Sequence, residues 1–364
     1  MNEIRAGIVG LGHFFESVHL PCMRRVKGLR IVAGCDLNEQ RRVRAASLLG
    51  KDVRLYVDHR EMIDACGLDA VYVITQPAAM LDIVPDVARA HLPLFCEKPP
   101  GLTSAHTRRL AEVARDARIP HQVAFNRRFG PFSGKLREWL NAAGTPSRVE
   151  VVFHRVWSPS PSEITGAGIH AIDLMLSLIG RARRVMATRA VPRGEGFGVF
   201  TAVIEFANGA AGSFVYDNRM SVPAEEYHIS IVSADTLSVE RLSLRFPPPS
   251  KLRQPSSATR TTMIYRDWVD GRALWDEQKE EFARPDLAGE DDLLIGGGYQ
   301  DEHDTFVRSL LAGAPLAPTF EQTVHSMEVA ETIQAGQSRE FQATPAVSQP
   351  WRPGGSVGQG PVQF

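Results

Sequence analysis

The sequence predicts an α/β fold with a parallel, doubly wound sheet, followed by an α+β domain with a large open, mostly antiparallel sheet. Strand and helix patterns alternate through the first 122 residues, and the strands are continuously apolar, as in sheets covered on both faces. A glycine-rich turn follows the first strand. From about residue 148, several strand patterns follow a single helix, which is typical of an α+β domain.

The glycine-rich turn gives the first indication of function. The apolar strand 4–9 leads into Gly10-Leu-Gly12, and a helical pattern begins at His13 and Phe14. The two glycines let the backbone turn tightly and approach a pyrophosphate, and the N–H groups at the start of the next helix favour that anion. The turn therefore predicts a Rossmann-type dinucleotide site.

The second strand, 29–35, ends at Asp36, where a carboxylate can accept both ribose hydroxyls of an adenosine. This predicts NAD, with NADP as the alternative. Capping of the next helix, within 36–41, is a second and compatible role for Asp36. Phe15 stands where the fingerprint has Gly or Ala, which predicts a wider gap between helix and strand without loss of binding.

The remaining elements of the first domain follow in alternation. They are a strand at 53–56, a helix from Asp58, a buried strand at 69–75, a helix at 79–91, a strand at 93–96, a helix at 103–117 capped by Thr103, and a strand at 121–125. We expect the dinucleotide-binding domain to occupy residues 1–122.

The second domain is expected at 123–345, with a loose tail at 346–364. Its patterns are strands at 148–157, 184–191, 198–206, 210–217 and 227–233, helices at 168–179, 299–312 and 320–336, a hairpin at Asn208-Gly209, and a loop at 246–260. An open sheet needs a cover on its free face, and a second subunit would supply one. We therefore expect a homodimer or homotetramer formed through this sheet.

Composition limits the classes of function. The chain has 364 residues and a formal net charge of −1, which argues against a nucleic-acid partner. No apolar run approaches the length of a membrane span, and the N-terminus shows no signal-peptide pattern, so no membrane partner is expected. The four cysteines, Cys22, Cys35, Cys66 and Cys96, lack metal-ligand spacing and are interpreted as buried thiols in a reducing cytoplasm.

Five motifs in order resemble the glucose–fructose oxidoreductase, inositol dehydrogenase and rhizopine catabolism (Gfo/Idh/MocA) family over roughly residues 4–340. They are Gly10-x-Gly12, Thr75-Gln-Pro77, Cys96-Glu97-Lys98-Pro99, Ala124-Phe-Asn-Arg-Arg-Phe129 and Gly168-Ile-His170-Ala-Ile-Asp173. The resemblance implies an active site between a Rossmann domain and an α+β domain, with Thr75 and Pro77 at the cofactor.

The resemblance also implies the reacting residues. Lys98 would reach the substrate hydroxyl and the nicotinamide ribose, with a pKa lowered by partial desolvation beside a positive ring. His170 would shuttle the proton. Glu97 would contact the ribose or orient Lys98, and Pro99 would follow a cis peptide bond.

The substrate side is less complete. Asp173 is expected as a substrate contact or a structural anchor. Asn126 and Arg127 lie at the crossover between domains, where an arginine binds an acidic group or forms a structural ion pair. Trp157 lines the cleft or packs in the core. Many family members carry an aspartate four residues before the histidine, and this chain has Gly166 there.

An acidic run at 301–304, Asp-Glu-His-Asp, suggests a metal cluster at first sight. On a helix only residues about one turn apart share a face, so a solvated acidic face is favoured and no metal is expected. The leading hypothesis is an NAD(P)-dependent oxidoreductase acting on a sugar, cyclitol or sugar-derived hydroxyl or ketone. The alternatives are an NAD-dependent glycosidase or lyase that uses transient oxidation, and a non-catalytic dinucleotide-binding regulator.

Overall fold

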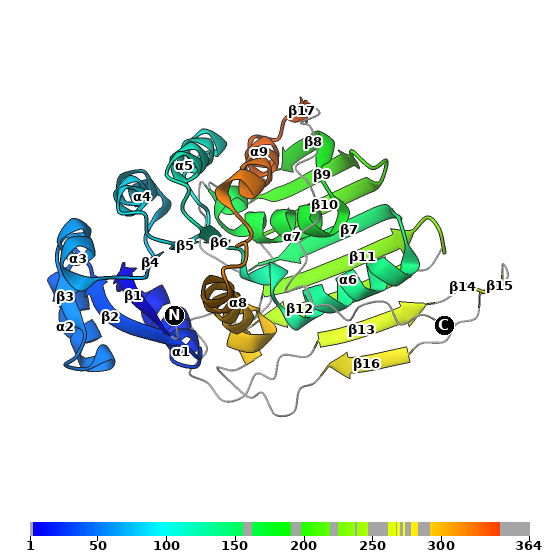
Figure 1. The fold of residues 1–364 in the computed structure, drawn as a ribbon. Helices are drawn as coiled ribbons and strands as arrows, with labels where there is room; N and C mark the ends of the chain where they lie inside the picture. Colours follow the sequence, from blue (N-terminus) through cyan, green and yellow to red (C-terminus); the bar gives the residue numbers. More distant parts are fainter. Residues whose placement is uncertain are drawn as a thin grey trace, which may run out of the picture.

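Two sheets, with helices between and around them, make up the computed structural model (Figure 1). It describes residues 3–155, 162–190, 198–218, 225–236, 239–246, 261–266, 268–269, 272–273, 278–282 and 292–342. Trp157, nearly all of the predicted loop 246–260 and the predicted tail 346–364 lie outside the described residues.

The first sheet has six parallel strands in the order β3-β2-β1-β4-β5-β6. The strands are β1 (Ile4–Val9), β2 (Leu29–Cys35), β3 (Arg54–Tyr56), β4 (Ala70–Val73), β5 (Leu94–Glu97) and β6 (His121–Ala124). The strand order reverses between β1 and β4, and ligands of doubly wound sheets bind at the carboxyl ends of the strands at such a point. The predicted doubly wound sheet is confirmed.

Three helices of the first domain begin at a residue whose side chain caps the helix. The segments are a π-helical turn η1 (Phe15–His19), α1 (Leu20–Met23), α2 (Glu39–Leu49), α3 (His59–Cys66), a 3-10 turn η2 (Pro77–Ala79), α4 (Met80–Arg89) and α5 (Ser104–Asp116). Thr103 caps α5 as predicted, because its side chain accepts from the His106 N–H. The proposed capping role of Asp36 is wrong, since Asn38 is the residue that caps α2.

The second sheet has nine strands in the order β16-β13-β12-β11-β7-β10-β9-β8-β17. They are β7 (Pro146–His154), β8 (Ala182–Ala190), β9 (Val199–Phe206), β10 (Ala211–Asp217), β11 (Glu225–Ser233), β12 (Val239–Phe246), β13 (Thr261–Arg266), β16 (Gln278–Phe282) and β17 (Ser338–Glu340), with β14 (Trp268–Val269) and β15 (Arg272–Ala273) paired separately. The β7–β10 pair is parallel and the others are antiparallel, which confirms an open, mostly antiparallel sheet.

Two helical segments lead into and cover this sheet. The chain crosses from β6 through η3 (Asn126–Arg128) into α6 (Pro131–Ala143), a helix that the sequence analysis missed. A π-helical turn η4 (Ile164–Gly168) continues into α7 (Ile169–Ile179), which is almost wholly buried against β7. The N-terminal end of the segment 164–179 therefore faces the first domain, and the rest of it packs in the core of the second domain.

The helices α8 (Tyr299–Ala312) and α9 (Phe320–Ala335) return to the first sheet, and their predicted ranges are confirmed. Figure 1 shows both between the two sheets, with α9 beside α5. Phe306 and Val307 of α8 pack into the same apolar cluster as residues of β1, β4 and β5. The expected solvated acidic face is wrong, because Glu302 and His303 are fully buried in this contact.

Candidate active site

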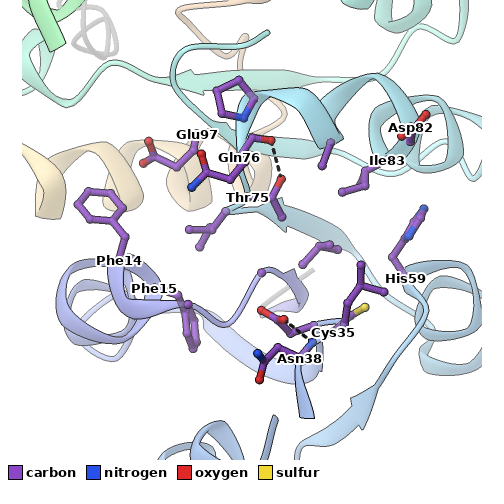
Figure 2. Close-up of a pocket in the computed structure, with 18 of the residues that line it drawn as sticks. Phe14, Phe15, Cys35, Asn38, His59, Thr75, Gln76, Asp82, Ile83 and Glu97 are labelled. Atoms are coloured by element: carbon purple, nitrogen blue, oxygen red, sulfur yellow. Dashed lines mark hydrogen bonds between the residues drawn. The ribbon is translucent and has the colours of Figure 1, made fainter. Parts of the chain in front are cut away.

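A cavity of about 1230 Å³ opens at the carboxyl edge of β1, β4 and β5 and reaches η4 of the second domain. All nine residues predicted to bind the cofactor line it: Gly10, Gly12, His13, Phe14, Asp36, Thr75, Pro77, Glu97 and Lys98. Figure 2 shows Phe14 and Glu97 on one side of this space and Thr75 and Gln76 beside them. The predicted residues are therefore brought together at one site.

The two glycines of the first turn are needed for different reasons. Gly10 has a φ of +98°, and a Cβ there would lie 2.2 Å from the Ile74 carbonyl oxygen. Gly12 lines the cavity, and a Cβ there would meet only the guanidinium of Arg41, at 3.7 Å. Gly10 thus permits the close packing of β1 on β4, and Gly12 leaves open the space that a pyrophosphate needs.

Asp36 is held by the backbone on both of its carboxylate oxygens. Oδ2 accepts from the Leu11 N–H at 2.9 Å, and Oδ1 accepts from the Asn38 N–H at 2.9 Å. The Arg41 guanidinium lies 3.5 Å from Oδ2, and its side chain is half exposed. Because a carboxylate has about four lone-pair sites, Asp36 can fix the glycine turn and still accept ribose hydroxyls.

Several further residues, which the sequence patterns do not single out, line the cavity. They are Arg41, His59, Arg60, Gln76, Asp82 and Ile83. Asp86 of α4 fixes two of them, at 2.8 Å from His59 Nε2 and 2.7 Å from Arg60 Nε. The signal that points to them is their position in the segments that follow the carboxyl ends of β2, β3 and β4.

Lys98 connects the two domains across the cavity. Glu97 ends β5, and its Oε2 accepts from the Lys98 backbone N–H at 3.0 Å. The Lys98–Pro99 peptide bond is cis, as the resemblance implied. The Lys98 ammonium donates to the Gly166 carbonyl at 3.2 Å, so its Nζ lies at the boundary between the dinucleotide end of the cavity and η4.

Gly166 leaves room for a side chain that this chain does not have. A Cβ there would meet only Ser162 Oγ, at 3.7 Å. Glu163 does not supply the missing acid at this position, because it is buried and accepts a hydrogen bond from the Tyr216 hydroxyl. Burial and the bond to Glu163 raise the pKa of Tyr216, which stays a neutral donor. The backbone carbonyl of Gly166, and not a side-chain carboxylate at this position, thus accepts the hydrogen bond from the Lys98 ammonium.

His170 lies near the start of α7 and is buried, with 8% of its surface exposed. Burial lowers its pKa well below the usual 6.5, and the charges of Lys98, Arg127 and Arg155 lower it further. Its Nδ1 has no hydrogen-bond partner among the described residues. His170 is therefore a neutral imidazole close enough to sense the Lys98 charge, although it does not line the cavity itself.

The other predicted substrate residues are engaged within the protein. Arg128 forms a bidentate pair with Asp173, and Ser326 of α9 donates to the same carboxylate at 2.8 Å. Asn126 Nδ2 and Arg127 NH1 donate to the Gly297 carbonyl, at 2.8 and 3.3 Å. Within the described ranges, no group of three or more His, Cys, Asp or Glu side chains is placed to hold a metal ion.

The comparisons with known proteins agree with this geometry. The N-terminal family model "Oxidoreductase family, NAD-binding Rossmann fold" matches residues 4–125, and the model of its C-terminal alpha/beta domain matches residues 163–340. The rhizopine catabolism protein MocA of Rhizobium meliloti is 26% identical, over 94% of this chain and 97% of its own. Inositol 2-dehydrogenase 2 of Saccharopolyspora erythraea is 28% identical, over 73% and 84%.

A solved structure shares the whole fold. A levoglucosan dehydrogenase, in complex with NADH and levoglucosan, superposes with a TM-score of 0.73 at 18% identity, over 93% of this chain and 99% of its own. Both family models fall on the domains that build the cavity, the first on the parallel sheet and the second on α7 and the mixed sheet. The chain belongs to the Gfo/Idh/MocA family of oxidoreductases and carries its NAD-binding Rossmann domain.

Proposed function

We propose that this protein is an NAD-dependent dehydrogenase or reductase that interconverts a hydroxyl and a carbonyl group on a sugar, a cyclitol or a sugar-derived compound. One observation carries the proposal: Lys98 spans from the dinucleotide end of the cavity to Gly166 of the second domain, at 3.2 Å. The inositol dehydrogenase relative supports the substrate class.

The chain's own residues would bind and orient the cofactor. Gly10 and Gly12 make space for the pyrophosphate, and Asp36 accepts the ribose hydroxyls. The carboxylate repels a 2′-phosphate, so NAD is preferred and NADP is the weaker alternative. When bound, the nicotinamide supplies the carbon that accepts or returns hydride.

Lys98 and His170 would handle the proton. The Lys98 ammonium donates a hydrogen bond to the substrate oxygen and stabilises the charge that develops on it. His170 is neutral, because burial and nearby cations lower its pKa, and a neutral imidazole can accept the hydroxyl proton. In carbonyl reduction the protonated His170 imidazole would return that proton, and Lys98 would again stabilise the charge on the oxygen.

The roles of the remaining predicted residues follow from their contacts. Of the two roles open to Asp173, its buried bonds to Arg128 and Ser326 favour the anchor. Asn126 and Arg127 join the crossover to Gly297 and would shape the substrate end of the site. Trp157 lies outside the described residues and stays a prediction.

The experiment is turnover of a panel of polyols, cyclitols and sugar acids with NAD, and of ketosugars with NADH, followed by absorbance of the reduced cofactor. We expect the protein to turn over at least one compound of the panel. For that compound, we expect kcat to fall by about 10²–10⁴-fold in Lys98→Ala. Lys51→Ala, at an exposed position, is the matched control. Full activity of Lys98→Ala on the true substrate would refute the assignment.

Gly166 favours a second candidate. Without an acid at this position, the site has fewer groups for simple polyol oxidation, and transient oxidation followed by elimination and re-reduction remains open, as in NAD-dependent glycosidases. This candidate predicts cleavage of a glycosidic bond with no net change in cofactor absorbance. Net reduction of NAD in equal amount to the product excludes it.

We also propose the assembly and location. Along β7, β9 and β10 buried side chains alternate with partly or fully exposed ones, so the face of the open sheet opposite the core is free to be covered by a second subunit in a homodimer or homotetramer. The four cysteines are free and buried, in line with a reducing cytoplasm. In the described residues, no helix is long and apolar enough to cross a membrane. The domain limits 1–122 and 123–345 and the absence of metal and nucleic-acid partners stay predictions.

A further inference from the structure

Two histidines from distant parts of the chain meet behind Glu97. His19 of η1 and His303 of α8 are both fully buried. His19 Nδ1 lies 2.9 Å from His303 Nε2, and His19 Nε2 lies 2.9 Å from Glu97 Oε1. The second contact is an ion-pair distance and not a well-aligned hydrogen bond, since Nε2 has no partner of good geometry. The contacts form a line from α8 to the cavity wall.

The ring of His303 is held in one orientation by its neighbours. It stacks on Phe95 of β5, with ring centroids 4.9 Å apart and planes at 20°, and on Tyr72 of β4, at 5.6 Å and 29°. The His19 ring stands edge-on to it, at 89°. Neither imidazole ring can therefore flip, which would exchange the positions of its nitrogen and carbon atoms, without breaking this packing.

The contacts set which atoms face one another along the line. A carboxylate oxygen has no proton to donate, so His19 Nε2, 2.9 Å from Glu97 Oε1, carries a proton and not a bare lone pair. His19 Nδ1 and His303 Nε2 share the next hydrogen bond of the line. Glu97 Oε2 already accepts from the Lys98 backbone N–H. Glu97 is thus the common acceptor of a donor chain on one side and of the Lys98 amide on the other.

We propose that His19 and His303 form a positioning pair that fixes the Glu97 carboxylate and, through it, the backbone at Lys98. The proposal rests on the proposed role of Lys98 in the reaction. Without the pair, Glu97 could turn away from the Lys98 amide, and the ammonium would lose its place opposite Gly166. The pair acts through Glu97 and touches neither substrate nor cofactor.

The surroundings of His303 favour its neutral form. Burial, and then the charge of the neighbouring His19, lower the pKa of His303 well below 6.5, so His303 takes up no extra proton near neutral pH. Glu97, at the end of β5, is the charged group in contact with the pair. Tyr72 of β4 stacks on His303. The charges of Glu302 and Asp304 of α8 act on Tyr72, and those of Glu97, Lys98 and Arg127 of η3 act on Glu302 beside His303.

Three variants separate positioning from packing. His303→Leu removes the ring nitrogen that bonds to His19 Nδ1 and places an apolar side chain against Phe95 and Tyr72. His303→Gln keeps an N–H donor for His19 Nδ1. Phe306→Leu is the matched control, because Phe306 is fully buried on the same helix and also contacts Tyr72 and Phe95 without joining the polar line.

The first measurement needs no substrate. In the ¹⁵N spectra of the wild-type protein with NAD bound, we expect a neutral His303 and a proton on His19 Nε2. We expect the Lys98 amide proton to shift upfield in His303→Leu and to stay unchanged in His303→Gln and Phe306→Leu. A His19 without a proton on Nε2, or an unmoved Lys98 amide in His303→Leu, overturns the proposal.

The second measurement uses the enzyme with its substrate. We expect kcat to fall by about 10–100-fold in His303→Leu, the range seen when a group that orients a reacting residue is removed, with little change in the KM for NAD. His303→Gln should recover most of that loss. If no compound in the panel is turned over, the proposed function fails, and the Lys98 amide shift still decides the positioning pair.

Discussion

The Arg128 guanidinium and the Asp173 carboxylate form a buried bidentate pair, with both N–O distances at 2.7 Å. Arg128 lies in the crossover after β6, Asp173 lies on α7, and Ser326 of α9 donates to the same carboxylate. The Asp173 carboxylate therefore joins three segments, η3, α7 and α9, at the interface between the domains.

Asp173→Asn should destabilise the protein by about 3–5 kcal/mol, because it leaves the Arg128 cation buried without its counter-charge. Thermal and urea unfolding measure this change. The double variant Arg128→Met/Asp173→Leu should be more stable than Asp173→Asn, since it removes both charges. A large rise in substrate KM with unchanged stability would instead assign Asp173 to the substrate.

Gly166→Asp should be tolerated, because the position has ordinary backbone angles and a Cβ would meet only Ser162 Oγ, at 3.7 Å. The new carboxylate would face the end of the cavity that Lys98 reaches. We expect a rise of about tenfold or more in kcat/KM for neutral polyols, as for an added acid–base group. Gly166→Asn is the uncharged control, and equal gains in both variants would contradict the charge argument.

His170 should titrate below pH 6.5, because burial and then the charge of Lys98 lower its pKa. The acid limb of kcat/KM is expected below that pH, where the imidazole gains its proton. In Lys98→Met, the loss of one cation should raise the His170 pKa, followed by the NMR shift of its C2 proton. Lys51→Met should leave it unchanged, and a wild-type titration above 6.5 would disprove the assignment.

Glu302→Gln should stabilise the protein at neutral pH. Burial, and then the Glu97 charge, raise the pKa of Glu302 well above 4.5, and neither carboxyl oxygen has a partner among the described residues. The stability that the neutral acid contributes is complete below pH 4.5 and is lost as pH rises through the folded-state pKa, because only the unfolded chain ionises freely.

The melting temperatures of wild type and Glu302→Gln should therefore diverge as pH rises above about 4.5, with a gap of a few degrees at neutral pH, since about 1 kcal/mol moves Tm by about 2–4 °C in a domain of about 150–250 residues and by less in a longer chain. The exposed Glu340→Gln is the control. A gap that is constant with pH would show that the carboxyl ionises equally in both states.

The dinucleotide end of the site could be predicted from the sequence because local backbone chemistry determines it. Gly10 must adopt a positive φ, and Thr103 and Asp58 cap their helices, so short motifs identify these positions. All nine predicted cofactor residues line one cavity for the same reason. A doubly wound sheet brings the carboxyl ends of its strands to one edge.

The error about the acidic face arose because its tertiary contact partner is far away in sequence. The polarity of Glu302 and His303 indicated a solvated face, yet α8 packs this face against the parallel sheet, where His303 forms a hydrogen bond with His19. Asp36 was also weighed as a cap for α2, but Asn38 takes that role, and its N–H donates to Asp36. The helix α6 was missed although Pro131 marks its first turn.

The return of α8 to the parallel sheet also constrains how the protein is made. Phe306, Val307 and Leu316 complete an apolar cluster whose other members lie before residue 125. During synthesis, part of one face of the parallel sheet stays uncovered until residues 306–316 have left the ribosome. Contacts between residues so far apart in sequence form slowly, and a folding intermediate exposes apolar surface until they form. The N-terminal domain expressed alone is therefore expected to aggregate.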